Sequence, residues 1–280
     1  MPSPRWIRHA AIVGVPLLIG AAGWSTIRPS HDRVWVAEHA RLPHAERDGS
    51  LVRIHDMRDF RYDSLNRPLP AYRTRTVDLD RLETVWFVLT PFERDRRGPA
   101  HAFLSFGFAD SQYIAISIEA RREAGESYSL VGGLLKRFEL AYIIGEERDL
   151  IGNRVLVQDD DVYVYPVRAT TAQARTLFID MIEAVNALYD RPAFYGTLRR
   201  NCTTVILDHV NRVASRRIRY GPRVLLPGYS DALALDLGII DTDLPLDEAR
   251  RRFRVNDRAA RFADDPAFPS RIRHRTDERD

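Results

Sequence analysis

The chain has 280 residues, a net charge of +3, 45% apolar residues and 29% charged residues. These values are typical of a folded protein with one large or two small domains, and they exclude an intrinsically disordered chain. Basic residues do not alternate with aromatic residues along any stretch, so we expect no nucleic-acid partner. Cys202 is the only cysteine, which excludes an internal disulfide.

The first 28 residues contain a candidate membrane segment. Arg5 and Arg8 precede an uncharged run over residues 10–27. As a helix this run is about 27 Å long, just enough to cross the bilayer core. The small residues at 20–22 are instead typical of a cleaved signal peptide. We predict an inner-membrane anchor with the main domain in the periplasm; the alternative is secretion to the periplasm after cleavage.

The remaining chain is predicted to form a polar linker over 29–50, one envelope domain over 51–263 and a disordered tail over 264–280. Short alternating apolar segments predict strands, and apolar residues at helical spacing predict helices. The strands are expected at 51–55, 72–77, 84–89, 140–144 and 162–167, and the helices at 131–137, 170–188, 202–213, 232–240 and 246–262. This pattern predicts an α+β domain with an antiparallel sheet and packed helices.

Residues 100–120 predict a β-hairpin that carries a histidine and a carboxylate. Both arms alternate in polarity, and an antiparallel pair must match apolar face to apolar face. Pairing Phe106 with Ile114 satisfies this requirement and sets His101 opposite Glu119. The Cβ atoms of such neighbours are about 5 Å apart, so the carboxylate could hold the imidazole. The alternative is an ordinary His/Glu pair on a solvent-facing sheet.

Cys202 is predicted at the start of the helix over 202–213. Asn201 is a good N-cap residue, which makes Cys202 the first helical residue. The unpaired N–H groups there favour an anion, so the thiol is biased toward the thiolate that attacks carbonyl groups. The alternative is that Cys202 is a small buried apolar residue. His209 lies on the same helix, but about 10 Å away by helix rise, so we reject it as the base for Cys202.

His101, Glu119 and Cys202 together supply what a cysteine hydrolase needs: a nucleophile, a base and a group that orients the base. No serine-hydrolase G-x-S-x-G motif occurs in the chain. No histidine lies at metal-ligand spacing near the proposed site, so we expect neither a metal nor another cofactor.

Several motifs between residues 100 and 204 resemble those of one bacterial envelope family. They are Ala-His-Ala-Phe-Leu-Ser-Phe-Gly-Phe at 100–108, Ser-Ile-Glu-Ala-Arg at 117–121, Gly-Glu-Ser-Tyr-Ser at 125–129, Glu-Arg-Asp at 147–149, and Arg-Pro at 191–192 leading to Asn-Cys-Thr-Thr at 201–204. The chain resembles the Lnb N-terminal periplasmic domain family, long labelled as a domain of unknown function. That family is similar to circularly permuted papain-like proteins, such as NlpC-type peptidases.

The resemblance implies roles for particular residues. His101 matches the base, Glu119 the orienting group and Cys202 the nucleophile. Contacts to the substrate or to an oxyanion are expected from five further residues, namely Ser117, Arg121, Tyr195, Asn201 and Thr203. The chain departs from the family pattern at Asp59, Phe194 and Gly196, which bears on substrate contacts and not on the three central residues.

The sequence therefore predicts a membrane-anchored thiol hydrolase or acyltransferase of the cell envelope, acting on an amide or ester. Its expected partners are the membrane, through the N-terminal segment, and an envelope substrate of peptide, peptidoglycan, lipid or lipoprotein nature. The alternative is a non-catalytic periplasmic binding or assembly domain that keeps the papain-like fold.

Overall fold

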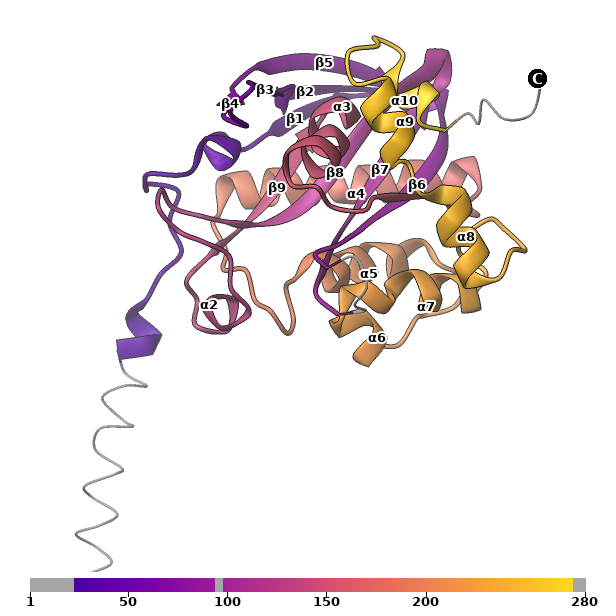
Figure 1. Cartoon of the computed structure of the whole chain (residues 1–280). Coiled ribbons are helices and arrows are strands. Elements are labelled where there is room, and N and C mark those ends of the chain that lie inside the picture. Colours follow the sequence, from indigo (N-terminus) through magenta and orange to yellow (C-terminus); the bar gives the residue numbers. More distant parts are fainter. Residues whose placement is uncertain (1–22, 94–97, 274–280) are drawn as a thin grey trace, which may run out of the picture.

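The computed structural model describes residues 23–93 and 98–273 (Figure 1). The strands are β1 (His44–Asp48), β2 (Leu51–Arg58), β3 (Arg61–Tyr62), β4 (Pro68–Leu69), β5 (Tyr72–Asp78), β6 (Leu82–Pro91), β7 (Ala100–Phe108), β8 (Gln112–Arg121), β9 (Glu139–Gly145) and β10 (Tyr163–Pro166). The helices are α2 (Leu130–Leu134), α3 (Glu147–Gly152), α4 (Thr171–Asp190), α5 (Cys202–Val213), α6 (Pro222–Leu225), α7 (Ser230–Asp236), α8 (Leu246–Phe253), α9 (Asn256–Arg261) and α10 (Phe268–Arg271). Short 3-10 helices, η1 (Ala37–His39), η2 (Leu79–Arg81), η3 (Ala109–Ser111) and η5 (Pro227–Tyr229), and a π-helix, η4 (Asn153–Val157), join them.

An eight-stranded sheet forms the centre of the fold. Its order is β1-β2-β9-β8-β7-β6-β10, and β5 also pairs with β2. The contact between β2 and β9 is parallel, through the single pair Arg58 and Gly145, whereas the other strand pairs of this sheet are antiparallel. The predicted α+β class is confirmed, but the sheet is mixed and not purely antiparallel.

The hairpin of β7 and β8 has the predicted register. Phe106 pairs with Ile114, and Phe103 pairs with Ser117. Every residue of β7 is buried, because helices cover both faces of the sheet at this point. The alternative of a solvent-facing His/Glu pair is therefore wrong, since His101 is only 6% exposed.

Two apolar cores lie on opposite faces of the sheet. On one face α4 and α5 pack against the strands, and Phe178 of α4 contacts the rings of Phe106 and Phe108 at 5.0 and 5.6 Å. On the other face lie α3, α9 and α10 (Figure 1). Fully burying one such aromatic side chain stabilises a fold by about 2–3 kcal/mol, so α4 and α5 hold β7 firmly.

The region predicted as a polar linker is part of the folded domain. His39 and Leu42 are buried, and β1 pairs with β2 along its whole length. The side chain of Arg121 donates hydrogen bonds to the backbone carbonyls of His39 and Ala40. The linker prediction is wrong because β1 is held by its pairing with β2 at the sheet edge. A short polar segment carries no sequence pattern from which such a pairing could be predicted.

Two predictions near the C-terminus also need correction. The single surface helix over 246–262 is two helices, separated where Arg254 adopts an extended conformation and pairs with Tyr163. The predicted disordered tail begins instead with packed structure, because Phe268 and Ile272 are fully buried. Three apolar residues in the stretch 264–273 give no helical period, so their burial could not be inferred from the sequence.

The predicted anchor or signal segment lies mostly outside the described residues, which begin at Gly23. Within the described part of the chain, no helix is both long enough and apolar enough to cross a membrane.

Candidate active site

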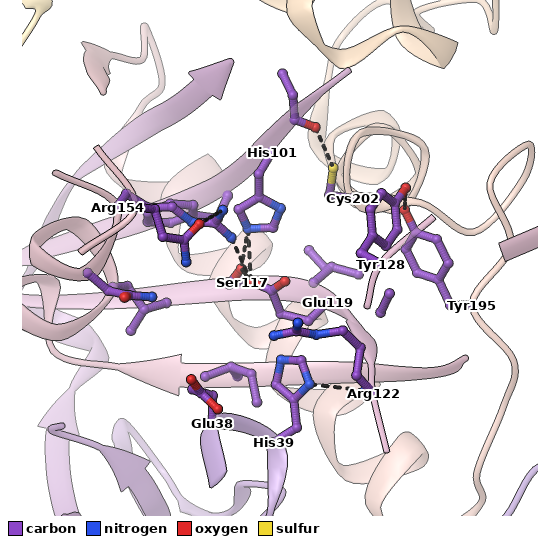
Figure 2. Close-up of a pocket in the computed structure, with 18 of the residues that line it drawn as sticks. Glu38, His39, His101, Ser117, Glu119, Arg122, Tyr128, Arg154, Tyr195 and Cys202 are labelled. Atoms are coloured by element: carbon purple, nitrogen blue, oxygen red, sulfur yellow. Dashed lines mark hydrogen bonds and ion pairs between the residues drawn. The ribbon is translucent and has the colours of Figure 1, made fainter. Parts of the chain in front are cut away.

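A cavity of about 370 Å³ lies where the β7–β8 hairpin meets the N-terminus of α5 (Figure 2). His101 enters it from β7, Ser117 and Glu119 from β8, and Cys202 from α5. Arg154 of η4 closes one side of the cavity. The structure thus brings Cys202 together with His101 and Glu119, which precede it in the sequence by about a hundred and about eighty positions.

Cys202 is held at the first position of α5 by a capping box. The side-chain oxygen of Asn201 accepts the N–H of Thr204 at 2.8 Å, and the Thr204 hydroxyl accepts the N–H of Asn201 at 3.0 Å. The predicted N-cap is confirmed. Because the positive end of the helix dipole lies here, negative charge on the Cys202 sulfur is favoured.

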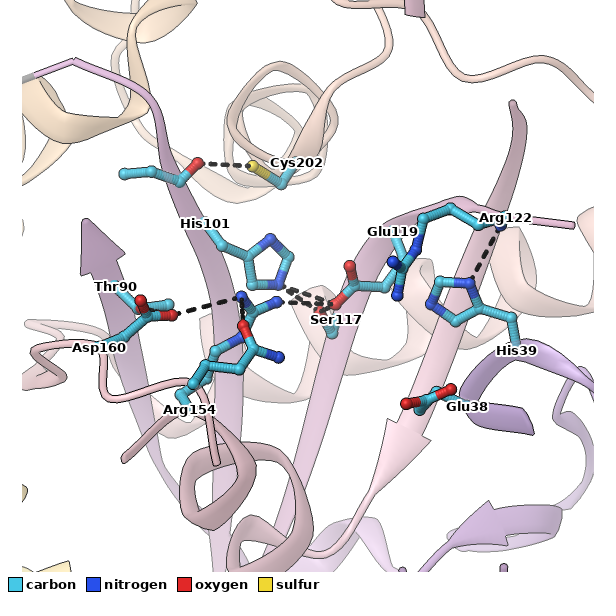
Figure 3. A network of polar contacts seen from close by, with 12 residues as sticks. Glu38, His39, Thr90, His101, Ser117, Glu119, Arg122, Arg154, Asp160 and Cys202 are labelled. Atoms are coloured by element: carbon cyan, nitrogen blue, oxygen red, sulfur yellow. Dashed lines mark hydrogen bonds and ion pairs between the residues drawn. The ribbon is translucent and has the colours of Figure 1, made fainter. Parts of the chain in front are cut away.

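Glu119 and Ser117 fix the His101 ring on the opposite side of the cavity. Its Nε2 lies 2.9 Å from Oε1 of Glu119 and 2.7 Å from the Ser117 hydroxyl, which itself donates to Glu119 at 2.7 Å. The Cys202 sulfur lies 4.0 Å from the backbone carbonyl oxygen of Ala100, the residue before His101, and interaction with the Cys202 side chain raises the pKa of His101. Figure 3 shows the second ring nitrogen on the side that faces Cys202. The imidazole therefore lies between the thiol and the carboxylate.

The pair of His101 and Glu119 carries opposite charges. Burial lowers the pKa of His101, but the Glu119 carboxylate outweighs this effect and raises the pKa to about 9. Burial works in the opposite sense on Glu119, but the charge of His101 holds the pKa of this carboxyl well below its usual value. The ring is consequently an imidazolium at neutral pH, ready to donate a proton.

Arg154 is a cavity residue that the sequence did not reveal. Its guanidinium donates to Gln158 at 2.8 Å, and its nitrogens lie 3.6 Å from Asp160 and 3.9 Å from Glu119. Its positive charge lowers the pKa of His101. It sits on a π-helix, a rare element without a sequence signature, so only its position after the Glu-Arg-Asp motif at 147–149 could have drawn attention to it.

His39 and Arg122 line the far end of the cavity (Figure 2). The backbone N–H of Arg122 donates to Nδ1 of His39, and burial lowers the pKa of His39 to about 3. His39 is therefore neutral, in contrast to His101. Both were missed because the first lies in the supposed linker and the second belongs to a charged stretch predicted to be a turn.

The five predicted contact residues separate into two groups. Ser117 and Tyr195 line the cavity, and the Tyr195 hydroxyl lies 3.3 Å from that of Tyr128. Asn201 and Thr203 do not line it: the first caps α5, and the hydroxyl of the second donates to the Val224 carbonyl.

Arg121 also lies away from the cavity lining. Its guanidinium stacks on the Trp35 ring at 4.0 Å and braces the segment before β1.

His209 occupies a separate site on the inner side of α5. It lies 2.8 Å from the Tyr142 hydroxyl and 2.5 Å from Asp180, and it does not line the cavity. Its buried, carboxylate-paired ring provides a matched comparison for His101. Among the residues that the structure describes, no three His, Cys, Asp or Glu side chains are arranged to hold a metal ion.

A comparison with known protein families matches residues 69–228 to the Lnb N-terminal periplasmic domain. The match covers more than half of the chain and includes His101, Glu119 and Cys202. The chain belongs to this family. It is therefore a periplasmic domain, as the motifs around these three residues predict. Comparisons with curated proteins and with solved structures give no match.

Proposed function

We propose that this Lnb N-terminal periplasmic domain is a thiol hydrolase or acyltransferase that acts on an amide or ester through Cys202. The observation that supports the proposal is the position of His101, which is held at Nε2 by Glu119 and shares the cavity with Cys202, with its second ring nitrogen on the side of the sulfur (Figure 3). Covalent acyl transfer by a thiol requires a nucleophile, an imidazole beside it that transfers protons, and a carboxylate that orients the imidazole. Cys202, His101 and Glu119 lie in this spatial order in the cavity.

The proposed reaction has two steps. Cys202 reacts as the thiolate beside the His101 imidazolium, and its sulfur attacks the substrate carbonyl carbon to form a C–S bond. When the C–N or C–O bond breaks, the imidazolium gives its proton to the leaving amine or alcohol. Water or an acceptor amine or alcohol then attacks the thioester carbonyl and gives its proton to the neutral His101 ring, and the C–S bond breaks to release Cys202 as the thiolate. The backbone N–H of Cys202 at the start of α5 stabilises the oxyanion in both steps.

The proposal includes a permuted papain-like arrangement. In such an arrangement a histidine on the sheet faces a cysteine at the N-terminus of a helix, and here the histidine comes first in the chain. It also includes residues 10–27 as an inner-membrane anchor, supported by their uncharged sequence and by the periplasmic family.

The test is labelling by an electrophilic thiol reagent at neutral pH. Because Cys202 is the only cysteine, the wild-type protein reports a single thiol. We expect labelling much faster than that of free cysteine, slower labelling in His101→Ala, and none in Cys202→Ala. His209→Ala is the matched control, because it removes a buried histidine from α5 without touching the cavity, and it should label like the wild type.

Two results would contradict the proposal. One is a Cys202 that labels no faster than free cysteine, and the other is equal labelling of His101→Ala and the wild type. Either result would favour a non-catalytic binding or assembly domain. For such a domain, cells carrying Cys202→Ser should behave like the wild type and unlike cells that lack the protein.

A further inference from the structure

The short helix α2 turns its apolar side chains outward. Its inner positions are Gly132 and Gly133, where any side chain would collide with Phe138 or Thr197. Four apolar residues on its outer side and at its C-cap are 46–61% exposed, namely Leu130, Val131, Leu134 and Leu135. A helix on a soluble domain normally places its apolar side chains toward the core, so α2 has the reverse polarity.

The apolar surface continues onto two neighbouring segments. The Thr197 hydroxyl donates to the Leu130 carbonyl at 2.7 Å, which places the next residue, Leu198, beside α2. The carbonyl of Leu198 in turn accepts a hydrogen bond from the Tyr220 hydroxyl, and both side chains are about half exposed. The α2 surface is the set of six residues Leu130, Val131, Leu134, Leu135, Leu198 and Tyr220. A contiguous apolar patch of this kind marks an interaction site.

The charged residues within the two segments that carry the leucines of the α2 surface are basic. Residues 127–138 and 191–207 contain no Asp or Glu. The same stretches carry Lys136, Arg137, Arg191, Arg199 and Arg200, of which Arg137 pairs with Glu126. Exposed leucines and a tyrosine beside basic side chains fit the boundary between headgroups and acyl chains of an anionic bilayer.

The α2 surface also lies beside the point where the described chain begins. Lys136 donates to the Trp24 carbonyl at 3.3 Å, and its ammonium group lies 5.2 Å from the centre of the Trp24 ring. Trp24 belongs to the uncharged run over residues 10–27. Figure 1 shows the first described residues and α2 on the same side of the molecule. A bilayer crossed by that run would therefore pass close to α2.

The mouth of the cavity adjoins the same surface. Tyr128, two residues before α2, lines the cavity, is 36% exposed, and has its ring 6.3 Å from that of Phe92. Both aromatic residues line the cavity that contains Cys202. We infer that the α2 surface rests in the headgroup region of the inner membrane and holds the cavity mouth against the bilayer. This inference rests on the proposed anchor.

Quenching of a reporter tryptophan by brominated lipid tests the inference. The full chain is reconstituted in vesicles of phosphatidylethanolamine and phosphatidylglycerol whose acyl chains carry bromine near the headgroups. Leu134→Trp places the reporter on the α2 surface. Leu69→Trp is the matched control, because Leu69 is a similarly exposed leucine on β4, which lies well apart from α2 in Figure 1. Emission of the wild type, with its own four tryptophans, is subtracted.

We expect brominated lipid to remove most of the emission added by Leu134→Trp and little of that added by Leu69→Trp. Equal emission from Leu134→Trp with brominated and plain lipid would overturn the inference, as would equal quenching of the two variants or failure of the chain to stay with the vesicles. If a second copy of the chain covered the α2 surface, the Leu134→Trp side chain would be shielded from water but not quenched by brominated lipid. This result would also overturn the inference. Thiol labelling of Cys202 in detergent tests the catalytic proposal independently of these results.

Discussion

Replacing Glu119 by glutamine should make His101 lose its charge at neutral pH. The amide keeps the size of the carboxylate and can still contact Ser117, but it carries no charge. Burial and the nearby Arg154 both lower the pKa of His101, and Glu119 is the main group that opposes them. The pKa should therefore fall from about 9 to below the ordinary value of 6.5. This change corresponds to at least about 3 kcal/mol of interaction between the two side chains.

The measurement is an NMR titration of protein labelled in its histidine rings, with the His101 signal assigned by its loss in His101→Ala. Asp180→Asn is the matched control, since it removes the carboxylate partner of His209 and should leave His101 unchanged. The reasoning would be refuted by a wild-type His101 that is already neutral at pH 7. It would also be refuted by a Glu119→Gln protein whose His101 stays protonated up to pH 9.

The same pair predicts how stability depends on pH. A raised pKa in the folded state stabilises the protein fully below the unfolded value of 6.5, and this contribution is lost as the pH rises through about 9. The lowered pKa of Glu119 contributes stability above its unfolded value of 4.5, which is lost at more acidic pH. The melting temperature of the wild type should therefore exceed that of Glu119→Gln most clearly between pH 5 and 6.5.

Three further predictions concern the surroundings of the site. Asn201→Ala removes the cap of α5 and should cost about 1 kcal/mol in urea unfolding, while Asn201→Asp should restore it; equal stability of all three proteins would contradict the capping role. Arg154→Gln should raise the pKa of His101 further, because Arg154 lowers it, and the same NMR titration would show this. Phe268→Ala should cost about 3–5 kcal/mol, because the ring is fully buried; a loss below 1 kcal/mol would indicate a frayed C-terminal region.

The parts of the site that the sequence predicts are those governed by local rules. The strand period and the matching of apolar faces are enough to set His101 opposite Glu119. The preference of asparagine for the N-cap is enough to place Cys202 at the start of α5. Both rules act within a few residues or across one tight turn, where few alternatives compete.

The parts that the sequence does not predict depend on distant contacts. His39 reaches the cavity because the segment around β1 adds to the sheet edge, and its burial follows from packing against Arg121 and its neighbours. Arg154 reaches it because Asp149 of α3 forms a buried ion pair with Arg58 of β2, with both N–O distances at 2.8 Å. Single sequences carry no signal for such pairings between elements nearly a hundred residues apart.

The charge of the site depends on one carboxylate, and its geometry depends on one packing contact. Burial and Arg154 both favour a neutral His101 ring, so Glu119 is the main group that maintains the imidazolium. Ala100 precedes His101 on β7, and its carbonyl lies 4.0 Å from the Cys202 sulfur, so the packing of β7 against α5 sets how close thiol and ring can come. The capping box and the hairpin register each position one partner, but neither alone brings the two together. The arrangement on which the proposed reaction depends is therefore a property of the folded core, and neither local structure would produce it alone.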